Sequence, residues 1–474
     1  MNDNKAFTKH YLDTILFPIP KTKKNRYINR DSLELIIRKE CNQQCEYCYI
    51  YKHGKELYPN TLSNEETLHN VDLLLDYVYN TRRNWFYDME LFAGDLFYDD
   101  IYFDVMELIE KYFKQVKLEE PNLFKMKTKI MMPCNFNFAY EHPEKLEKIK
   151  TLCKRFWENY HTELNFSWST DGLYGEPNRE KSNYTEEYFD TLFERLSGIS
   201  VGLHPMTYAN NIEVMKESYD WWLEKIKKYF LPKNPNQDFQ PMMLEVRNGE
   251  EWSDEKIESY KDFLTHVFNT RLKMNNDSIE EMAYHIFGNS RQQLKDKGIL
   301  PACRNYDIIL LPKISEEERP EEKKRERSSC AIQGMIHLNA TNLSIVLCHR
   351  LAYKVFTSLY FIVNEENTKI IDFRENNIDA LITVKTLKEQ NFPGCSVCKF
   401  GKICLKGCLG AQFEQNSDVF LPIPSVCKLF KSKFKHLVTL YKNSGVLDKA
   451  LELDLIQDYT YRYYMELLEE NIDV

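Results

Sequence analysis

Several features that mark other protein classes are missing from this 474-residue sequence. No apolar run approaches 18 uninterrupted residues, so we expect neither a membrane-spanning helix nor a membrane partner. The first ten residues, MNDNKAFTKH, contain no apolar signal segment, so we expect an intracellular, cytoplasmic protein. A formal charge of -9 and a pI near 5.8 argue against a nucleic-acid partner. We also find no internal repeat and no low-complexity segment.

Cysteine, in contrast, is plentiful, and most of its 13 residues fall into two groups. Cys41, Cys45 and Cys48 lie within one short loop, directly after an apolar run that predicts a strand at 33–37. Three thiolates on one loop can ligate three irons of a four-iron cluster and leave the fourth iron open to a small molecule. The alternatives are buried free cysteines or a zinc site, although zinc sites usually combine two paired knuckles.

The C-x3-C-x2-C spacing, with Tyr47 before the last cysteine, resembles the signature of the radical S-adenosylmethionine (SAM) enzymes. The resemblance implies that Cys41, Cys45 and Cys48 hold a 4Fe-4S cluster and that Tyr47 is one of the cofactor-binding residues. In that family the amino and carboxylate groups of SAM chelate the open iron. Reductive cleavage of the sulfonium then gives a 5'-deoxyadenosyl radical, which abstracts hydrogen from an unactivated C-H bond.

The second cysteine group lies near the C-terminal end and follows the pattern C-x2-C-x5-C-x3-C, with further cysteines on both sides. It resembles the SPASM domain, an extension of radical SAM peptide and protein maturases that binds two auxiliary 4Fe-4S clusters. The resemblance therefore implies three 4Fe-4S clusters in all. It assigns Cys395, Cys398, Cys404 and Cys427 to a distal auxiliary cluster, and Cys330, Cys348 and Cys408 to a proximal one.

Cys134, Cys153 and Cys303 remain outside both groups, and ordinary buried thiols are the simplest interpretation of all three. Cys303 is also available as the fourth ligand of the proximal cluster, unless that position stays open for substrate. A disulfide framework is a poor alternative, because the chain is far longer than the small secreted scaffolds that need disulfides. The family pattern has glycine five residues before the second proximal cysteine, where this chain has Leu343.

Short apolar runs alternate with longer amphipathic ones between about 32 and 250, as expected of β/α units around a parallel sheet. The pattern resembles the partial (β/α)6 barrel of radical SAM enzymes, a TIM-like α/β fold, here followed by a small Cys-rich auxiliary iron-sulfur domain. We expect strands near 33–38, 89–92, 127–132, 164–168, 199–203 and 242–246. We expect helices near 63–80, 101–116, 143–160, 185–197 and 213–230.

The same pattern predicts five segments along the chain. Residues 1–31 form an N-terminal extension that is too short for the leader-binding domain of many peptide-modifying relatives. A separate leader-binding protein or an unusual docking surface is therefore expected. The partial barrel, a helical and charged linker, the SPASM domain and the closing helices are expected at 32–250, 251–329, 330–435 and 436–474.

Loops after the expected strands carry short matches to the family, at the edge where chemistry sits in parallel sheets. Gly94 and Asp95 stand in the place of a Gly-Glu pair that holds the SAM amino group. Asp is one methylene shorter than Glu, so a backbone contact can replace that of the acid. Ser169 matches the ribose ligand, and Arg179 matches an arginine that follows that turn. Cys134 follows the third expected strand, which places it near the barrel mouth.

The resemblance implies a radical SAM iron-sulfur enzyme that modifies a peptide or protein. We expect a ribosomally made precursor peptide as substrate, and flavodoxin or ferredoxin as electron donor. Possible products are thioether or carbon-carbon crosslinks, an epimerised centre, or formylglycine. A radical SAM enzyme that modifies tRNA or a metabolite is the alternative from another class. A non-enzymatic iron-sulfur or zinc scaffold is a further one.

The fate of the substrate radical depends on groups near the clusters. His349 directly follows Cys348, where sulfatase-maturing relatives hold an acid, so it is a candidate base for oxidation. A histidine that only packs on the cluster shell is the equal alternative. Cys134, Cys153 or Cys303 is instead a candidate for returning a hydrogen atom, as a dedicated thiol does in peptide epimerases.

Overall fold

The chain has an α/β fold, and its helices and strands belong to two compact units in the computed structural model. Unit 1 takes in described residues within 1–169, 198–201 and 330–387, and unit 2 those within 170–197, 202–329 and 388–474. The structure describes residues 32–97, 99–175, 179–180, 184–233, 243–246, 248–249, 251–288, 308–311, 332, 335–385, 387, 391–404 and 406–472.

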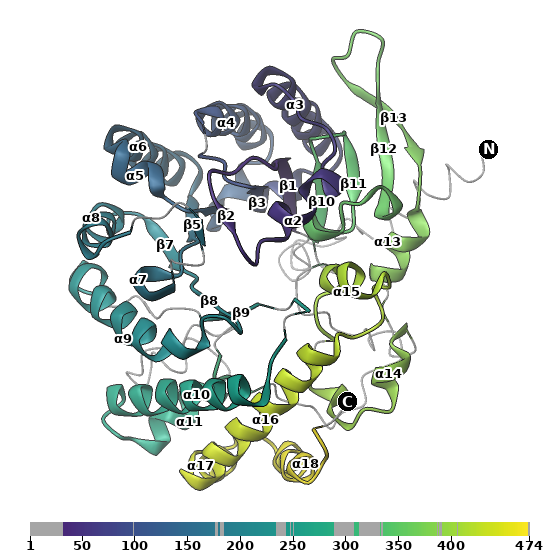
Figure 1. Cartoon of the computed structure of the whole chain (residues 1–474). Coiled ribbons are helices and arrows are strands. Elements are labelled where there is room, and N and C mark those ends of the chain that lie inside the picture. The colour runs from purple at the N-terminus through teal and green to yellow at the C-terminus, as the bar shows by residue number, and fades with distance from the viewer. Residues whose placement is uncertain are drawn as a thin grey trace. The chain divides into compact units, whose positions relative to one another are not determined.

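A nine-stranded sheet runs through the described residues (Figure 1). Its strands are β1 (Ser32–Arg38), β3 (Asp88–Ala93), β4 (Thr128–Cys134), β5 (Thr162–Trp168), β7 (Ser200–Leu203), β10 (Met335–Asn339), β11 (Ser344–Val346), β12 (Thr357–Val363) and β13 (Ile370–Glu375). The strand order is β13-β12-β11-β10-β1-β3-β4-β5-β7. The pairs β10–β1, β1–β3, β3–β4 and β4–β5 are parallel, whereas the pairs from β10 to β13 are antiparallel and form a meander.

Helices follow the parallel strands of unit 1, as the hydrophobic periodicity predicts. They are α3 (Asn64–Thr81), α4 (Ile101–Glu119) and α6 (Pro143–Tyr160). Ser63 and Glu66 form a capping box at the start of α3, which fixes where that helix begins. α3 packs against α4 and α6 packs against β5, and Figure 1 shows all three on the outer side of the sheet. Shorter helices of this unit are α2 (Tyr49–Leu57), α5 (Asn137–Glu141) and α13 (Ile378–Lys385).

The expected barrel differs from the observed sheet in two respects. The sixth expected strand, 242–246, is reduced to β9 (Leu244–Glu245), which pairs with β8 (Met206–Thr207) in a separate two-stranded sheet. Pro241 and Gly249 bracket this segment, and both residue types disfavour a longer strand. The second difference is that residues 335–375, expected within the auxiliary-cluster domain, extend the sheet beyond β1.

Unit 2 is mainly helical. Its buried core is rich in aromatic rings, for example Tyr441, which packs against Phe268 and Phe287. No helix in the described parts of the chain has the length and apolar character needed to cross a membrane. The helices and remaining short strand of unit 2 are α7 (Gly172–Gly175), β6 (Arg179–Glu180), α8 (Glu186–Leu196), α9 (Met215–Lys225), α10 (Asp254–Met274), α11 (Ile279–Phe287), α14 (Pro393–Ser396), α15 (Leu409–Asn416), α16 (Pro424–Asn443), α17 (Val446–Glu452) and α18 (Asp458–Leu468).

Candidate functional site

The first cysteine loop begins directly after β1, at the carboxyl edge of the sheet. The Cys48 N–H donates to the Cys45 carbonyl oxygen at 3.0 Å, and Cys48 is the N-cap residue of α2. The Gln43 N–H donates to Cys41 Sγ at 3.4 Å. Desolvation by surrounding protein, then the Asp95 carboxylate and the other two thiols, raises the pKa of Cys41, although solvent still reaches this residue. A nearby cation would favour the Cys41 thiolate, and cluster irons can supply one.

The loop after β3 packs directly onto the cysteine loop. The Gly94 N–H donates to the Arg38 carbonyl at 3.1 Å, and the Asp95 N–H donates to the Glu40 carbonyl at 2.7 Å. A Cβ atom at Gly94 would lie 2.2 Å from the Lys39 carbonyl oxygen, so only glycine permits this approach. The backbone of this loop thus lies against the residues that lead into the cysteines.

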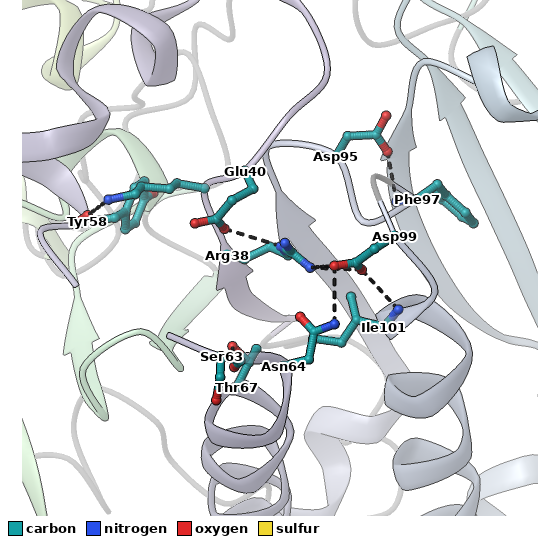
Figure 2. Close-up of polar contacts among 11 residues, drawn as sticks. Arg38, Glu40, Tyr58, Ser63, Asn64, Thr67, Asp95, Phe97, Asp99 and Ile101 are labelled. Atoms are coloured by element: carbon teal, nitrogen blue, oxygen red, sulfur yellow. Dashed lines mark hydrogen bonds and ion pairs between the residues drawn. The ribbon is translucent and has the colours of Figure 1, made fainter. Parts of the chain in front are cut away.

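Asp95 itself is buried, and its Oδ1 accepts the Phe97 N–H at 2.9 Å (Figure 2). Burial raises the pKa of Asp95 to about 7, against the opposing effects of that hydrogen bond and of Arg38. One carboxylate oxygen is therefore committed to its own loop. The expectation that backbone groups of this loop replace the contact of the longer acid stays a prediction.

A polar network that no sequence pattern predicts joins the two loops (Figure 2). Arg38 Nη1 lies 2.9 Å and 2.8 Å from the carboxylate oxygens of Asp99, and Arg38 Nε lies 3.2 Å from Glu40. Asp99 also accepts from Asn64 Nδ2 at 3.3 Å and from the Ile101 N–H at 3.0 Å. Burial opposes ionisation of Asp99, but the hydrogen bonds from Arg38 outweigh it and lower the pKa. The network joins the end of β1 to the first residues of α3 and α4.

Cys134 ends β4 and lies close to the same loops. Its side chain is buried, and its Sγ accepts the Phe136 N–H at 3.2 Å. Burial, then Asp95 and more weakly Cys41, raises the pKa of the Cys134 thiol, so these three groups lie within electrostatic reach of one another. A hydrogen bond of 2.6 Å from Asn135 Nδ2 to Asn42 Oδ1 also joins the β4 loop to the cysteine loop.

Three further residues are expected to bind SAM, and the structure describes their positions in different detail. The Ser169 N–H donates to the Cys134 carbonyl oxygen at 2.8 Å, which holds the half-buried Ser169 at the edge where Cys134 lies. Tyr47 lies half-buried within the cysteine loop. Arg179 belongs to unit 2, and its backbone lies in β6, but its side chain is outside the described part of the chain.

Cys348 follows β11 and is buried in unit 1. Leu343, which stands where the family has glycine, has a φ of 49°, so the turn keeps the left-handed conformation that glycine favours. Cys330 and Cys303, expected as ligands near Cys348, lie outside the described residues. The proximal cluster therefore remains a prediction.

His349 is held on several sides in unit 1. Its Nδ1 lies 2.8 Å from Oε2 of the buried Glu34, and its ring stacks on Phe92 at a centroid distance of 4.2 Å. The Tyr58 hydroxyl donates to the His349 carbonyl oxygen. Desolvation would lower the pKa of His349, but the Glu34 carboxylate outweighs it and raises the pKa. The ring is thus oriented by its neighbours, while 33% of the side chain remains exposed.

The second cysteine group gathers within unit 2. Burial, then the neighbouring thiols of Cys404, Cys395 and Cys398, raises the pKa of Cys427 to about 12, so all four expected distal ligands lie near one another. Cys408 is the N-cap residue of α15. It lines the same cavity as Cys395, Cys404 and Cys427, and this cavity has a volume of about 90 Å³. The structure brings these residues together, and their role as ligands remains a prediction.

The state of the thiols fits a cluster. No disulfide joins any of the eleven cysteines in the described part of the chain. Within the described ranges, no three His, Cys, Asp or Glu side chains converge on a point suited to a single metal ion. Each thiolate of a four-iron cluster binds a different iron, so its ligands need not converge in that way.

Comparison with known proteins gives a limited result. No family model and no curated protein matches the chain. Solved structures similar to it include native anSMEcpe with bound AdoMet, with a TM-score of 0.47 and 14% identity over 87% of this chain and 99% of that one. Native anSMEcpe with bound AdoMet and Cp18Cys peptide has a TM-score of 0.46, with the same identity and coverage. With TM-scores below 0.5, functional assignment depends on the residues of the two cysteine groups.

Proposed function

We propose that this chain is a radical SAM enzyme of the SPASM type that modifies a peptide or protein. The observation that carries the proposal is the convergence of three loops at one edge of the sheet, where the Asp95 N–H donates to the Glu40 carbonyl oxygen and Asn135 Nδ2 donates to Asn42 Oδ1. The gathering of three further cysteines, Cys395, Cys398 and Cys404, around Cys427 in unit 2 supports it independently. We assign three 4Fe-4S clusters to the enzyme, with SAM at the cluster of the first loop.

When bound, a 4Fe-4S cluster with one open iron supplies the electron for reductive cleavage of SAM into a hydrogen-abstracting species. The residues of the chain position the reactants. Cys41, Cys45 and Cys48 hold the cluster, and the ion pair between Arg38 and Asp99 fixes the end of β1 on which their loop depends. Gly94 lets the neighbouring loop lie close enough for its backbone groups to orient the amino group of the cofactor.

The substrate radical has two competing fates, oxidation or quenching by a thiol. We propose oxidation, because two auxiliary clusters offer an exit for the electron that quenching does not need. Glu34 holds Nδ1 of His349, which leaves Nε2 as the ring nitrogen that can meet a substrate proton. Cys134, which is buried beside Asp95, is the thiol that would serve the competing route.

We further propose a ribosomally made precursor peptide as substrate, with a thioether or carbon-carbon crosslink as product. A separate leader-binding protein and a flavodoxin or ferredoxin electron donor complete the proposal. Epimerisation and formylglycine formation are the competing outcomes. Mass spectrometry of the treated peptide separates an epimer, which keeps the original mass, from a crosslink, which removes two hydrogens. Formylglycine made from Ser loses the same two hydrogens, so its aldehyde is identified by reaction with a hydrazide.

The test is anaerobic reconstitution followed by analysis of metal content and SAM cleavage. We expect about 12 irons per chain, and formation of 5'-deoxyadenosine when a reductant is added. Replacing Cys41, Cys45 and Cys48 together by Ala should abolish 5'-deoxyadenosine while leaving about two thirds of the iron. Cys153→Ala is the matched control, because Cys153 lies in α6, outside both cysteine groups. SAM cleavage that survives in the triple variant, or zinc in place of iron in the wild type, would overturn the proposal.

A further inference from the structure

A lysine lies among the cysteines of unit 2. Lys406 stands between Cys404 and Cys408 in the sequence, and only 3% of its surface is exposed. It lines the same cavity as Cys395, Cys404 and Cys427. Lysine is almost never fully buried unless its charge is compensated, so this position needs an explanation.

The ammonium group of Lys406 is directed toward the turn that carries the other cysteines. Its Nζ donates to the carbonyl oxygen of Gly401, which lies between Cys398 and Cys404. A Cβ atom built on Gly401 would lie 3.6 Å from Lys406 Nζ and 3.1 Å from the Cys395 carbonyl oxygen. The positive charge and the backbone of Cys395 thus approach the same glycine.

The backbone at Lys406 makes this placement costly. Its φ is 58°, in the left-handed region that glycine adopts freely and other residues rarely do. Gly407 follows with a φ of 75°, and Gln412 Nε2 donates to the Lys406 carbonyl oxygen at 2.6 Å. A glycine at 406 would avoid the strain, so what this chain gains from Lys406 must come from its side chain.

Two other charged residues, Glu245 and Lys431, line the cavity or act on its thiols, and their surroundings differ from those of Lys406. Glu245 lines the cavity, but Lys433 Nζ lies 2.8 Å from its Oε1 and compensates the carboxylate. Lys431 lies close enough to oppose the rise in the pKa of Cys427, but it is only half-buried, so solvent screens its charge more than that of Lys406. Lys406 is therefore the more deeply buried of these two cations.

We propose that the buried charge of Lys406 raises the reduction potential of a 4Fe-4S cluster held by Cys395, Cys398, Cys404 and Cys427. This inference rests on the proposed function. Four thiolates leave such a cluster with net negative charge, and net charge and solvent exposure are main determinants of its potential. A cation in a poorly screened interior favours the reduced form, in which the cluster has gained one electron and no proton. Such a cluster is a better acceptor for the electron that leaves an oxidised substrate radical.

The test compares substitutions that separate charge from shape. Lys406→Gln keeps a hydrogen-bond donor but removes the charge, and Lys406→Arg keeps the charge. Lys402→Met is the matched control, because Lys402 lies on the neighbouring turn but is exposed, with its Nζ 2.8 Å from the Tyr459 hydroxyl. All variants are made in the triple Cys→Ala background that lacks the SAM cluster. Adding Cys395→Ala to this background removes the cluster of interest, so the paramagnetic signal that disappears identifies the cluster to follow.

Redox-poised electron paramagnetic resonance then gives the midpoint potential of that cluster. We expect Lys406→Gln to lower the equilibrium constant for its one-electron reduction at least tenfold, which corresponds to about 59 mV. Lys406→Arg and Lys402→Met should stay near the wild type. Loss of the cluster in Lys406→Gln but not in Lys406→Arg would also support the proposal, because cluster binding would then depend on the charge.

Three results would overturn the inference. The first is an unmoved potential in Lys406→Gln, and the second is an equal shift in Lys402→Met, which would indicate a general effect of surface charge. The third is loss of the cluster in both Lys406→Gln and Lys406→Arg, which would indicate a requirement for shape alone. A wild type without iron at these cysteines would instead overturn the proposed function together with this inference.

Discussion

Removal of the Asp99 carboxylate should loosen the whole edge of the sheet that carries the first cysteine loop. The Arg38 side chain is 10% exposed and that of Asp99 is 31% exposed, so Asp99→Ala leaves a poorly solvated guanidinium without its Asp99 partner. Charged hydrogen bonds of this kind contribute about 1.5–3 kcal/mol. Because nearly a third of the Asp99 side chain meets solvent, we expect a loss of free energy of unfolding near the lower limit, about 1.5–2 kcal/mol.

Urea unfolding of the apo-protein measures this loss, and hydrogen exchange of the 36–48 segment locates it. Glu158→Ala is the matched control, because the Lys154–Glu158 pair has a distance of 3.8 Å and exposed fractions of 75% and 60%. The control should cost no more than about 0.5 kcal/mol. Equal losses in the two variants, or unchanged exchange at 36–48 in Asp99→Ala, would refute the reasoning about Arg38.

The same ion pair predicts the direction of a pH effect. The pKa of Asp99 is lowered in the folded state from its ordinary value of 3.8. Its contribution to stability is therefore fully present well above pH 3.8 and is lost as the pH falls through the lower folded pKa. The difference in stability between the wild type and Asp99→Ala should shrink in that acidic range. A difference that grows on acidification would contradict the assignment.

Three further predictions concern the site. Gly94→Ala should lower the free energy of unfolding by about 1–3 kcal/mol and abolish SAM cleavage, because the added methyl group meets the Lys39 carbonyl. Gly198→Ala is the control, because the nearest atom to its added methyl group is 3.9 Å away, and it should leave unfolding and cleavage unchanged. Cys395→Ala should lose one cluster and product formation yet keep some reductive SAM cleavage. Iron analysis and chromatography measure these changes, and loss of all iron in the folded variant would contradict independent cluster sites. His349→Ala should slow product formation while Ala variants of the spare thiols remain active. If the product takes up solvent deuterium at a peptide α-carbon, and one thiol variant abolishes this uptake, the result would favour quenching of the substrate radical instead.

Local sequence patterns predicted the parts of this structure that depend on local physics. The helix at 143–160 agrees with α6 at both ends, because proline starts it and its apolar residues recur at helical spacing. The glycine expected to bind the cofactor, Gly94, is one that no larger residue can replace without a collision. Such features are visible because the residue type itself limits the backbone.

Features that depend on pairing across the chain could not be predicted in this way. Glu34 lies opposite His337 in the register of β1 and β10, and it also binds His349, yet nothing in the sequence links these positions. The ion pair between Arg38 and Asp99 has the same origin, since charged residues are common at strand and helix ends. Leu343 shows the converse, because the sequence lacks the glycine of the family while the backbone keeps the left-handed turn.

The place of β10 beside β1 has a consequence for how the chain matures. β1 ends at Arg38 and β10 begins at Met335, so one edge of β1 stays without its native partner while about 300 residues are synthesised. At about 5–20 residues per second this interval is on the order of 15–60 s. The apolar strand Leu33–Ile37 is then an open edge, which favours wrong pairing, and the adjacent cysteines lack the support of their finished sheet. We therefore expect iron delivery to the proposed cluster of the first loop to follow completion of the sheet.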